Sequence, residues 1–472
     1  MILRRVLIAN RGEIAVRILR TCQALGIETV LAVSDADRDS VPARLADAAI
    51  PIGASYLDVD AVLRAALAAG AQAVHPGYGF LSESPRLARA CDAAGLVFIG
   101  PTAGQLDAVG DKLAARDRAA AAGLPVVPGG AVGSRADAAT LAAEIGWPVL
   151  VKAVGGGGGR GLRAVCEPAQ LDAAIERAIA EAGAAFGDPR VYLERQVTPG
   201  RHVEVQLLGD GERVIHLGDR DCSVQRRYQK LLEEAPAPLL DEGLRAEIRR
   251  AAVAFGQHLG YRGLGTVEFL VDAPRGACYF LEMNARIQVE HPVTEAICGL
   301  DLVAEQIAVA EGRPLRLAQE DVALAGNAIE CRINAEDAGN GFRPSPGTVT
   351  RAVFPAGPGI RVDTHVQTGS AVPPGYDSLL AKLIVSGRNR ADALARLRGA
   401  LARCEIDGVA TTIGLHAALA ADPEFCRGGV DLGYLGRFLG RGGGAPGAGD
   451  ASGAGDAGRA AGRRIGAGGR RG

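Results

Sequence analysis

One short run of the chain gathers six side chains whose chemistry suits an active site. Between Phe280 and Thr294 it holds two carboxylates, two amides, a guanidinium and an imidazole: Glu282, Asn284, Arg286, Gln288, Glu290 and His291. The run begins with alternating apolar and polar residues, as strands do, so Glu282 and Asn284 are predicted on one strand face. Burying a strand face made of carboxylate and amide groups costs free energy, and a bound cation would offset that cost.

A second carboxylate is predicted beside this strand. Residues 264–271 read as an apolar strand that carries Glu268, and a turn at 272–276 leads into the strand that carries Glu282. Antiparallel pairing then places Glu268 next to Glu282, with Asn284 nearby. Oxygen ligands of this kind are those that Mg²⁺ prefers when it bridges nucleotide phosphates. The sequence therefore predicts a magnesium site here.

A glycine run in residues 147–161 suggests how phosphates would be held. The sequence WPVLVKAVGGGGGRG places Lys152 on a strand, followed by five glycines and an arginine, and the strand Leu162–Val165 comes next. Glycines let backbone N–H groups approach an anion closely, and the lysine adds a point charge. The spacing is not that of a Walker loop. Because apolar strands flank both sides, we predict a hairpin lid over phosphates.

The elements before this run alternate between strand and helix. Strands are predicted at 5–9, 27–33, 71–75 and 96–100, with helices at 14–25 and 61–69. This order indicates a doubly wound βαβ domain. Its first strand-to-helix turn has a single glycine, Gly12, rather than GxGxxG, so dinucleotide binding is not expected there. Further along, residues 219–230 hold four basic side chains without helical periodicity. A solvated basic loop is the ordinary interpretation, although the LLEEAP that follows leads back toward a core.

Composition excludes several classes of function. A chain of 472 residues is expected to form two to four domains. The formal net charge of −2 gives no general attraction to nucleic acid or to an anionic membrane. Nine scattered cysteines without metal-ligand spacing fit a reducing compartment. With no signal-like or spanning segment, we expect a cytoplasmic protein without nucleic-acid or membrane partners.

Ten motifs in order resemble biotin carboxylase, the ATP-grasp subunit or domain of biotin-dependent carboxylases, from about residue 3 to 440. They are VLIANRGEIAVRILR, HPGYGFLSES, VGDK, VKAVGGGGGRG, DCSVQRRYQK, LEEAPAP, EMNARIQVEHPVTE, ECRINAED, PSPG and GYDSLLAKL. The resemblance implies an α/β N-terminal domain (1–110), an ATP-grasp domain (111–330) with a glycine-rich lid (about 130–197), and a mixed α+β C-terminal domain (331–440). The Gly-, Ala- and Arg-rich tail 441–472 is expected to be a disordered extension.

The resemblance also implies a reaction. ATP and bicarbonate would give carboxyphosphate, and the carboxyl group would pass to N1′ of biotin, with Mg²⁺ or Mn²⁺ as the metal. Biotin would sit on a separate biotin carboxyl carrier protein, because the chain has only Met1 and Met283 and lacks room for a biotinyl domain. Carboxyltransferase subunits and a second copy of the chain are the other implied partners. Acetyl-CoA carboxylase, in fatty acid biosynthesis, is the expected setting.

Site residues are carried over position by position. Those that match the family's nucleotide contacts are Lys112, Lys152, Gly156, Gly157, Gly158, Gly159, Glu194, Val197, His202 and Gln225. The metal positions are Glu268, Glu282 and Asn284. The bicarbonate positions are Lys230, Arg286, Gln288, Val289 and Glu290. The biotin positions are Tyr78 and Arg332.

Four of these residues are expected to be catalytic. Glu290 would act as general base on bicarbonate, which Arg286 would bind bidentately beside Lys230. Arg332 would stabilise the oxygen that becomes enolate-like when biotin N1′ loses its proton. The chain departs from many relatives in having Tyr228 where they have histidine, and we expect at most an altered nucleotide affinity.

Two other functional classes are compatible with parts of the sequence. A different ATP-grasp ligase, such as a carbamoyl-phosphate synthase or a purine-pathway carboxylase, is disfavoured by ECRINAED and RIQVEHP, and biotin dependence of turnover would separate it. A non-catalytic nucleotide-binding subunit is disfavoured because the expected catalytic residues are present.

Overall fold

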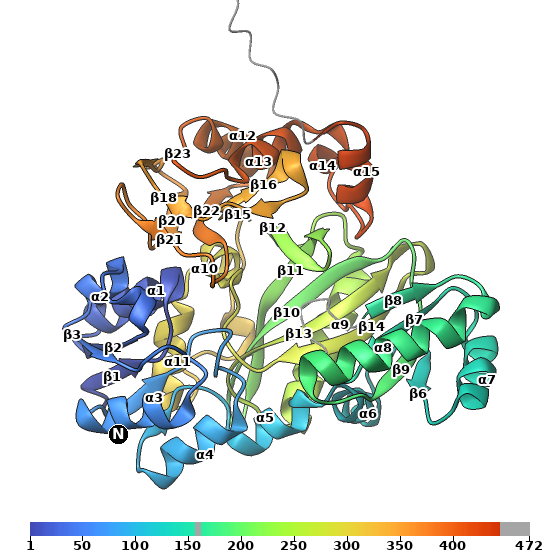
Figure 1. The fold of residues 1–472 in the computed structure, drawn as a ribbon, viewed down its shortest axis with the longest axis horizontal. Coiled ribbons are helices and arrows are strands. Elements are labelled where there is room, and N and C mark those ends of the chain that lie inside the picture. The colour runs from blue at the N-terminus through green and yellow to red at the C-terminus, as the bar shows by residue number, and fades with distance from the viewer. Residues whose placement is uncertain (156–161, 444–472) are drawn as a thin grey trace, which may run out of the picture.

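A five-stranded parallel sheet begins the fold of the computed structural model, which describes residues 1–155 and 162–443 (Figure 1). In spatial order its strands are β3 (Ala48–Pro51), β2 (Glu28–Val33), β1 (Arg5–Ile8), β4 (Ala73–His75) and β5 (Val97–Phe98). Side chains of β1 alternate between two cores. Val6 and Ile8 pack in the core that contains α1 (Gly12–Ala24), whereas Leu7 packs with α3 (Val59–Ala68) and α4 (Pro85–Ala93). Helices on both faces confirm the predicted doubly wound arrangement.

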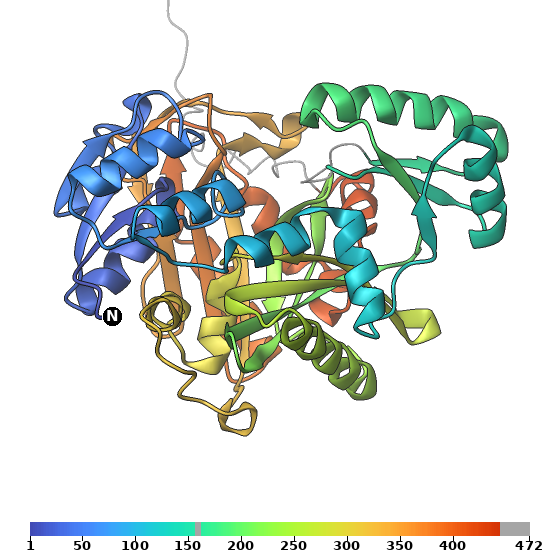
Figure 2. The same ribbon diagram turned by 90° about the horizontal axis from the view of Figure 1, so that it is seen from below.

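A long antiparallel sheet of eight strands forms the centre of the molecule. In spatial order these are β14 (Ala277–Asn284), β13 (Arg262–Asp272), β10 (Arg201–Asp210), β11 (Val214–Arg226), β12 (Gln229–Ala235), β15 (Asn327–Asn334), β22 (Leu379–Gly387) and β20 (Ile360–Thr364). The pairing of β12 with β15 joins its two halves, with Glu233 opposite Glu330. Residues from distant parts of the sequence therefore share one continuous surface (Figures 1 and 2).

Helices bury the apolar side chains of the long sheet. The amphipathic helix α9 (Glu242–His258) places Ile248, Ala252 and Phe255 in one core with residues of β10 and β13. α11 (Leu302–Ala310) joins the core of the N-terminal sheet, and α12 (Arg390–Leu401) packs in the C-terminal core. The other helices of this half are α10 (His291–Cys298), α13 (Ile413–Ala421), α14 (Pro423–Arg427) and α15 (Tyr434–Gly440).

A separate four-stranded sheet lies to one side of the long sheet, under the helix α8 (Leu171–Phe186) (Figure 2). Its strands, in spatial order, are β6 (Gly129–Ala131), β9 (Val191–Arg195), β7 (Val149–Ala153) and β8 (Leu162–Val165). β7 and β8 pair antiparallel, with Lys152 opposite Leu162, as expected for a hairpin. Gly156–Gly159 of the predicted lid lie outside the described residues. Helix α7 (Arg135–Ile145) packs on this sheet, and α5 (Ala103–Gly110) and α6 (Lys112–Ala121) lead into it.

The interpretation of residues 219–230 as a solvated loop is wrong. β11 continues through this segment to Arg226, and after a two-residue turn β12 returns from Gln229. Arg220, one of the four basic residues of the segment, is fully buried. Charge without helical periodicity suggests solvent exposure, whereas Arg220 and Lys230 face buried carboxylates across the sheet. Arg227 and Tyr228 form the turn and have positive φ values of 48° and 67°.

Short two-stranded pairings complete the C-terminal part. They join β16 (Glu336–Asp337) with β17 (Arg343–Pro344), β18 (Gly347–Thr348) with β21 (Ala371–Val372), and β19 (Arg351–Val353) with β23 (Glu405–Asp407). The short helix α2 (Val41–Leu45) and five 3₁₀ turns lie in connections elsewhere along the described chain. Within residues 1–155 and 162–443, no helix combines the length and the apolar character needed to cross a membrane.

The contact between α9 and the long sheet generates a stability prediction. Phe255 is fully buried and meets Phe280 edge-on, with ring centroids 5.2 Å apart. Phe255→Ala should lower the free energy of unfolding by about 3–5 kcal/mol, because it leaves a cavity and removes this ring contact. Urea unfolding followed by circular dichroism measures the change. Leu67→Ala, at an exposed position on α3, is the control and should change it by less than about 0.5 kcal/mol; equal effects would contradict this view of the core.

Candidate active site

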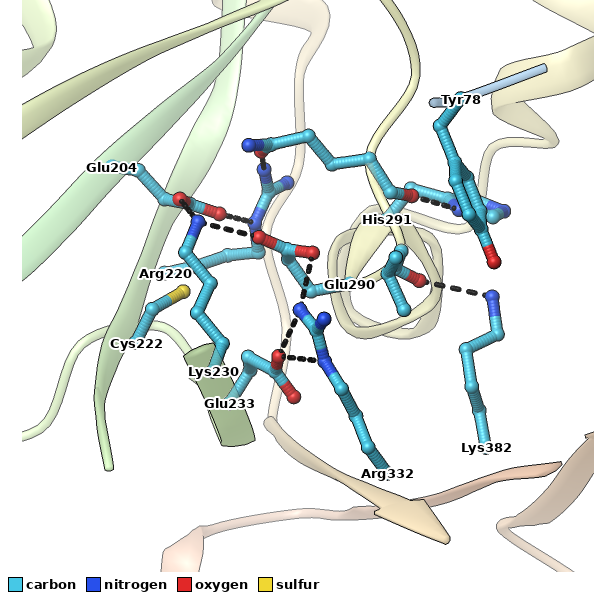
Figure 3. Close-up of polar contacts among 12 residues, drawn as sticks. Tyr78, Glu204, Arg220, Cys222, Lys230, Glu233, Glu290, His291, Arg332 and Lys382 are labelled. Atoms are coloured by element: carbon cyan, nitrogen blue, oxygen red, sulfur yellow. Dashed lines mark hydrogen bonds and ion pairs between the residues drawn. The ribbon is translucent and has the colours of Figure 1, made fainter. Parts of the chain in front are cut away.

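Lys230 lies at the centre of a buried cluster of carboxylates on the long sheet. Its ammonium group donates to Glu204 at 2.6 Å and to Glu290 at 2.7 Å (Figure 3). It also donates to Glu268 at 2.8 Å. These carboxylates come from β10, β13 and the connection before α10. Burial alone would lower the pKa of Lys230, but the three negative charges raise it well above its ordinary value. One cation thus holds together three segments of the chain.

Arg220 supports the same cluster from β11. Its guanidinium donates to Glu204 at 2.6 Å, to Gln288 at 2.7 Å and to Gln206 at 2.8 Å. It also donates to Thr266 and Thr294 at 3.2 and 2.9 Å. These five acceptors come from four parts of the chain, and such a rigid planar fork fixes their relative positions. Gln288 in turn donates to Glu268 at 3.0 Å.

Glu290 lies between two cations. One oxygen accepts from Lys230 at 2.7 Å, and the other accepts from Arg332 of β15 at 2.8 Å (Figure 3). Burial favours the neutral acid, but Lys230, Arg332 and Arg220 lower the pKa of Glu290 below its ordinary value. Arg332 is held from behind by Glu233 of β12, which accepts from its Nε at 2.6 Å. The structure therefore joins the predicted bicarbonate residues to Arg332.

Arg286 is held by a residue from the N-terminal part of the chain. Its Nε donates to Glu83 at 3.0 Å, and its Nη2 donates to the amide oxygen of Asn284 at 2.7 Å. Glu83 also accepts from the backbone N–H of Ala285 at 3.1 Å. One carboxylate thus fixes both the side chain and the backbone at the start of this connection.

The carbonyl of Val289 accepts from Lys382 of β22 at 2.9 Å.

The two lysines expected at the nucleotide phosphates each meet a carboxylate. Lys152 of β7 donates to Glu194 of β9 at 2.8 Å, and Arg116 of α6 lies 3.2 Å from the other oxygen of Glu194. Both oxygens of Glu194, one of the predicted nucleotide contacts, are thus engaged by cations. Lys112, the first residue of α6, lies 3.1 Å from Glu282. The charge of Lys112 is the main cause of the lowered pKa of Glu282.

His202 and Gln225 also come together. Gln225 on β11 lies 2.9 Å from Nδ1 of His202 on β10, and Nε2 of His202 lies 3.0 Å from Glu268. Burial acts to lower the pKa of His202, but Glu268 raises it above its ordinary value. Val197 lies in an apolar cluster with Val127 and Leu270. Tyr228 is half-exposed in the turn between β11 and β12.

The residues predicted to bind a metal fit a hard divalent cation in their donor set. Glu268 and Glu282 stand directly opposite each other on β13 and β14, and Asn284 donates to Glu268 at 3.0 Å. Carboxylate and amide oxygens are the ligands that Mg²⁺ and Mn²⁺ take. His202, Glu204 and Glu268 also bring three ligand atoms within 4.8 Å of one another. Glu268 belongs to both groups.

Tyr78 lies at the edge of this cluster, on the side of Lys382 (Figure 3). Its hydroxyl donates to Glu13 of α1, and burial together with the charge of Glu13 raises its pKa well above the ordinary value. The nearby charge of Arg332 acts in the opposite direction on the pKa of Tyr78. The predicted biotin residues therefore come from the N-terminal and C-terminal parts of the chain.

Several residues of the site were not predicted from the sequence. They are Glu83, Arg116, Glu204, Arg220, Glu233 and Lys382. Glu204 carried a detectable signal: it lies between Val203 and Val205 on β10, and a carboxylate on a buried strand must face a buried partner. The others depend on pairings between distant segments, which strand periodicity does not reveal.

Family models match three consecutive stretches of the chain. "Biotin carboxylase, N-terminal domain" covers residues 2–106, "Carbamoyl-phosphate synthase L chain, ATP binding domain" covers 111–318, and "Biotin carboxylase C-terminal domain" covers 330–437. Among curated relatives, a biotin carboxylase of Nostoc sp. is 49% identical over 91% of this chain and 98% of the relative. One pyruvate carboxylase component, from Methanothermobacter thermautotrophicus, is 48% identical over 90% of this chain and 88% of the relative.

Solved structures show the same similarity. A biotin carboxylase–βγ-ATP complex from Campylobacter jejuni has a TM-score of 0.90 and 44% identity, and the match covers 92% of this chain and 99% of that one. The biotin carboxylase domain dimer of Hydrogenobacter thermophilus 2-oxoglutarate carboxylase, in complex with MgADP, ADP and bicarbonate, has a TM-score of 0.91 and 44% identity over 93% and 98%. The fold and these matches place the chain among the ATP-dependent ligases. The chain belongs to the biotin carboxylase family, as the sequence motifs predicted.

A buried carboxyl behind Arg332 gives a pH-dependent prediction. Glu330 lies opposite Glu233, is fully buried, and neither of its oxygens has a hydrogen-bond partner among the described residues. Burial raises the pKa of Glu330 well above its ordinary value, and the neighbouring carboxylates add to this. The unfolded chain then ionises at a lower pH than the folded protein does. Because of Glu330, the folded protein therefore loses stability as pH rises above about 4.5, the ordinary pKa of a glutamate.

Glu330→Gln keeps the shape of the side chain and removes the ionisation. Its unfolding free energy should match that of the wild type near pH 4 and exceed it increasingly as pH rises, by about 1.4 kcal/mol per pH unit until the folded pKa is reached. Urea unfolding at a series of pH values measures the difference. A difference that stays constant with pH would contradict a neutral Glu330. Glu405→Gln, at an exposed position on β23, is the control and should show no such trend.

Proposed function

We propose that the chain carboxylates biotin on a carrier protein, using ATP, Mg²⁺ or Mn²⁺ and bicarbonate, with carboxyphosphate as the intermediate. Membership of the biotin carboxylase family supports this activity. The observation that carries the proposal is the position of Glu290, which shares one oxygen with Lys230 and the other with Arg332. A group at this point serves both the residues proposed for bicarbonate and the residue proposed for biotin.

Bicarbonate would bind between Arg286 and Lys230, with contributions from Gln288 and the backbone of Val289. Glu290 would accept its proton as it attacks the γ-phosphate. Two adjacent cations lower the pKa of Glu290, so Glu290 is a weak base before the anion binds. An anion bound here competes for Lys230 and adds negative charge, and both effects raise the pKa of Glu290. Substrate binding would therefore prepare the base.

The nucleotide would lie between the two sheets. We propose Lys112, Lys152 and Gly156–Gly159 as phosphate contacts and Glu194, Val197, His202 and Gln225 as further contacts. Lys152 donates to Glu194, and the phosphates of the nucleotide would replace this carboxylate as its partner. Glu268, Glu282 and Asn284 would hold the metal, which when bound neutralises charge on the transferring phosphoryl group. Residues 130–197 would act as the lid. The proposed domain boundaries lie at about residues 110, 330 and 440.

Biotin would bind between Arg332 and Tyr78. The guanidinium of Arg332 is held at one edge by Glu233 and reaches Glu290 with the other. This placement suits stabilisation of the ureido oxygen as N1′ is deprotonated. Glu290 is close enough to Arg332 to influence the same proton. Tyr78 would close the far edge of this pocket.

We further propose a homodimer that works with a biotin carboxyl carrier protein and carboxyltransferase subunits. A domain dimer among the similar structures supports the first part. For the final acceptor we propose acetyl-CoA or a related acyl-CoA. Relatives named for pyruvate and 2-oxoglutarate carboxylases are nearly as similar, so the acceptor is decided by experiment. Identifying the biotinylated protein that copurifies with the chain would decide it.

The overall reaction gives the first test of this function. The purified chain should cleave ATP slowly, only with bicarbonate and Mg²⁺, and free biotin should accelerate the cleavage. The reason is that carboxyphosphate forms first and is then consumed by carboxyl transfer to biotin. Coupled measurement of ADP release with and without each component checks the expectation. ATP cleavage that is indifferent to bicarbonate would exclude the proposal.

Two arginines should fail in different ways. Arg286→Ala removes the proposed bicarbonate contact, so bicarbonate-dependent ATP cleavage and biotin carboxylation should both fall. Arg332→Ala removes a cation whose main role comes later, so ATP cleavage without biotin should largely persist while carboxybiotin formation falls by about 10²–10³-fold. Loss of Arg332 also frees one oxygen of Glu290 and raises its pKa, which keeps the base competent. Assays of ADP and of carboxybiotin separate the two steps.

Matched controls sharpen this comparison. Arg388→Ala, at an exposed position whose ion pair is with Asp392 one helical turn away, should leave both activities unchanged. Lysine at position 286 or 332 should not restore function well, because the planar fork rather than the charge alone matches a carboxylate or ureido edge. Equal loss of both activities in the two alanine variants would contradict the division of the pocket into a bicarbonate part and a biotin part.

A further inference from the structure

Lys382 of β22 is a fully buried ammonium group beside the proposed bicarbonate site. Its Nζ donates to the carbonyl of Val289 at 2.9 Å (Figure 3). The same Nζ lies 3.0 Å from Glu13 and 3.9 Å from Asp363, which supply opposing charge. Glu13 supplies an ion pair to Lys382, and the carbonyl of Val289 accepts a hydrogen bond from the same ammonium group. A buried cation thus holds one peptide group.

That peptide group belongs to a segment that lacks its own regular structure. Residues 285–290 connect β14 to α10 without helix or strand hydrogen bonds, so side chains from elsewhere must fix them. The carbonyl of Gln288 accepts from Nδ1 of His291 at 2.7 Å. The next carbonyl, that of Val289, accepts from Lys382 (Figure 3). Two successive peptides are therefore each held by a separate donor.

Planarity of the peptide bond carries this restraint to the catalytic group. The carbonyl of residue 289 shares one plane with the nitrogen and the Cα of Glu290. Fixing the oxygen therefore fixes where the Cα of Glu290 lies and leaves rotation about its N–Cα bond as the main backbone freedom that directs the Glu290 side chain. It also limits rotation about the Cα–C bond of Val289. A short shift here changes how Glu290 meets Lys230 and Arg332.

Lys382 also joins distant parts of the chain at this point. Glu13 lies on α1, Val289 precedes α10, and Lys382 lies on β22. Glu13 accepts in addition from the hydroxyl of Tyr78, the residue proposed at the edge of the biotin pocket. Burial raises the pKa of Glu13, and the charge of Lys382 opposes this. The carboxylate therefore depends on Lys382 as its counter-charge.

We propose that Lys382 is a positioning residue for the carboxylation reaction: by holding the 289–290 peptide it sets the orientation of Glu290 and of the Val289 backbone toward bicarbonate. This inference rests on the proposed bicarbonate site. Lys382 does not touch the substrate and acts through the peptide. Its removal should therefore weaken the use of bicarbonate more than the binding of nucleotide, whereas a merely structural lysine would affect both or neither.

Lys382→Met tests the proposal, because methionine is unbranched and apolar and lacks the donor. The KM for bicarbonate in ATP cleavage should rise about 10–100-fold, the range for loss of one charged hydrogen bond. The KM for ATP and the affinity for MgADP should stay within about twofold of wild type. Steady-state kinetics with each substrate varied, together with MgADP titration, give this ratio. A bicarbonate KM that rises no more than the ATP KM would overturn the proposal.

Arg245→Met is the matched control. Arg245 on α9 is also a buried cation that pairs with a carboxylate, Asp219 at 2.6 Å, and donates to a carbonyl, that of Ala237 at 3.0 Å. These contacts lie outside residues 285–290. Its replacement should lower the thermal midpoint and leave the KM for bicarbonate unchanged. If Lys382→Met shifted kinetics only as Arg245→Met does, Lys382 would be structural and the proposal would be wrong.

A second variant keeps the test decisive if Lys382→Met does not fold. Glu13→Gln retains an oxygen that accepts from Tyr78 but removes the counter-charge of Lys382, so the KM for bicarbonate should rise several-fold; no rise in a folded Glu13→Gln protein would overturn the proposal. Arg286→Ala separates this inference from the proposed function. If Arg286→Ala raises the bicarbonate KM and the Lys382 and Glu13 variants do not, the bicarbonate site stands and the inference fails. If wild-type turnover ignores bicarbonate, the proposed function itself fails.

Discussion

The balance of buried charge around Lys230 is the constraint on which the rest of the structure depends. Three carboxylates, from Glu204, Glu268 and Glu290, approach one ammonium group within 2.8 Å. Removing any partner would leave an uncompensated charge in a medium that solvates it poorly, which is far more costly than the pair itself is stabilising. Arg220 and Arg332 supply the remaining positive charge. The site is therefore folded as a unit, and each strand that carries a member must be in register.

The long sheet satisfies this constraint geometrically. β10, β11, β12, β13 and β15 lie side by side, so a carboxylate or a cation on each strand meets partners on its neighbours. The pairing of β12 with β15 carries the surface across to the C-terminal part and brings Arg332 to Glu290. Residues 285–290 lie against this surface and are held by contacts from three regions, through Glu83, Arg220 and Lys382. Irregular backbone at the candidate site is thus fixed by regular structure around it.

Local pattern was enough to predict most elements and to bring together the residues expected at the metal. Strand periodicity placed Glu268 opposite Glu282, because a turn between two apolar strands fixes their pairing. It failed for Arg220, since a basic residue in a strand is read as exposed unless its buried partner is known. Lys382 and Glu83 were invisible for the same reason: their partners lie 93 and 203 residues away. Only the tertiary arrangement, or the family motifs that encode it, specifies such pairs.

A site built in this way has a consequence for how its parts act. Glu290 shares its two oxygens between Lys230 and Arg332, so the proton affinity of the base depends on what each cation is doing. A ligand that attracts Lys230 raises the pKa of Glu290, and a ligand that attracts Arg332 does the same from the other side. In the proposed function, two substrates that bind on opposite sides of this carboxylate would therefore influence each other without a conformational change. Coupling of the two proposed chemical steps at Glu290 would follow from this shared position.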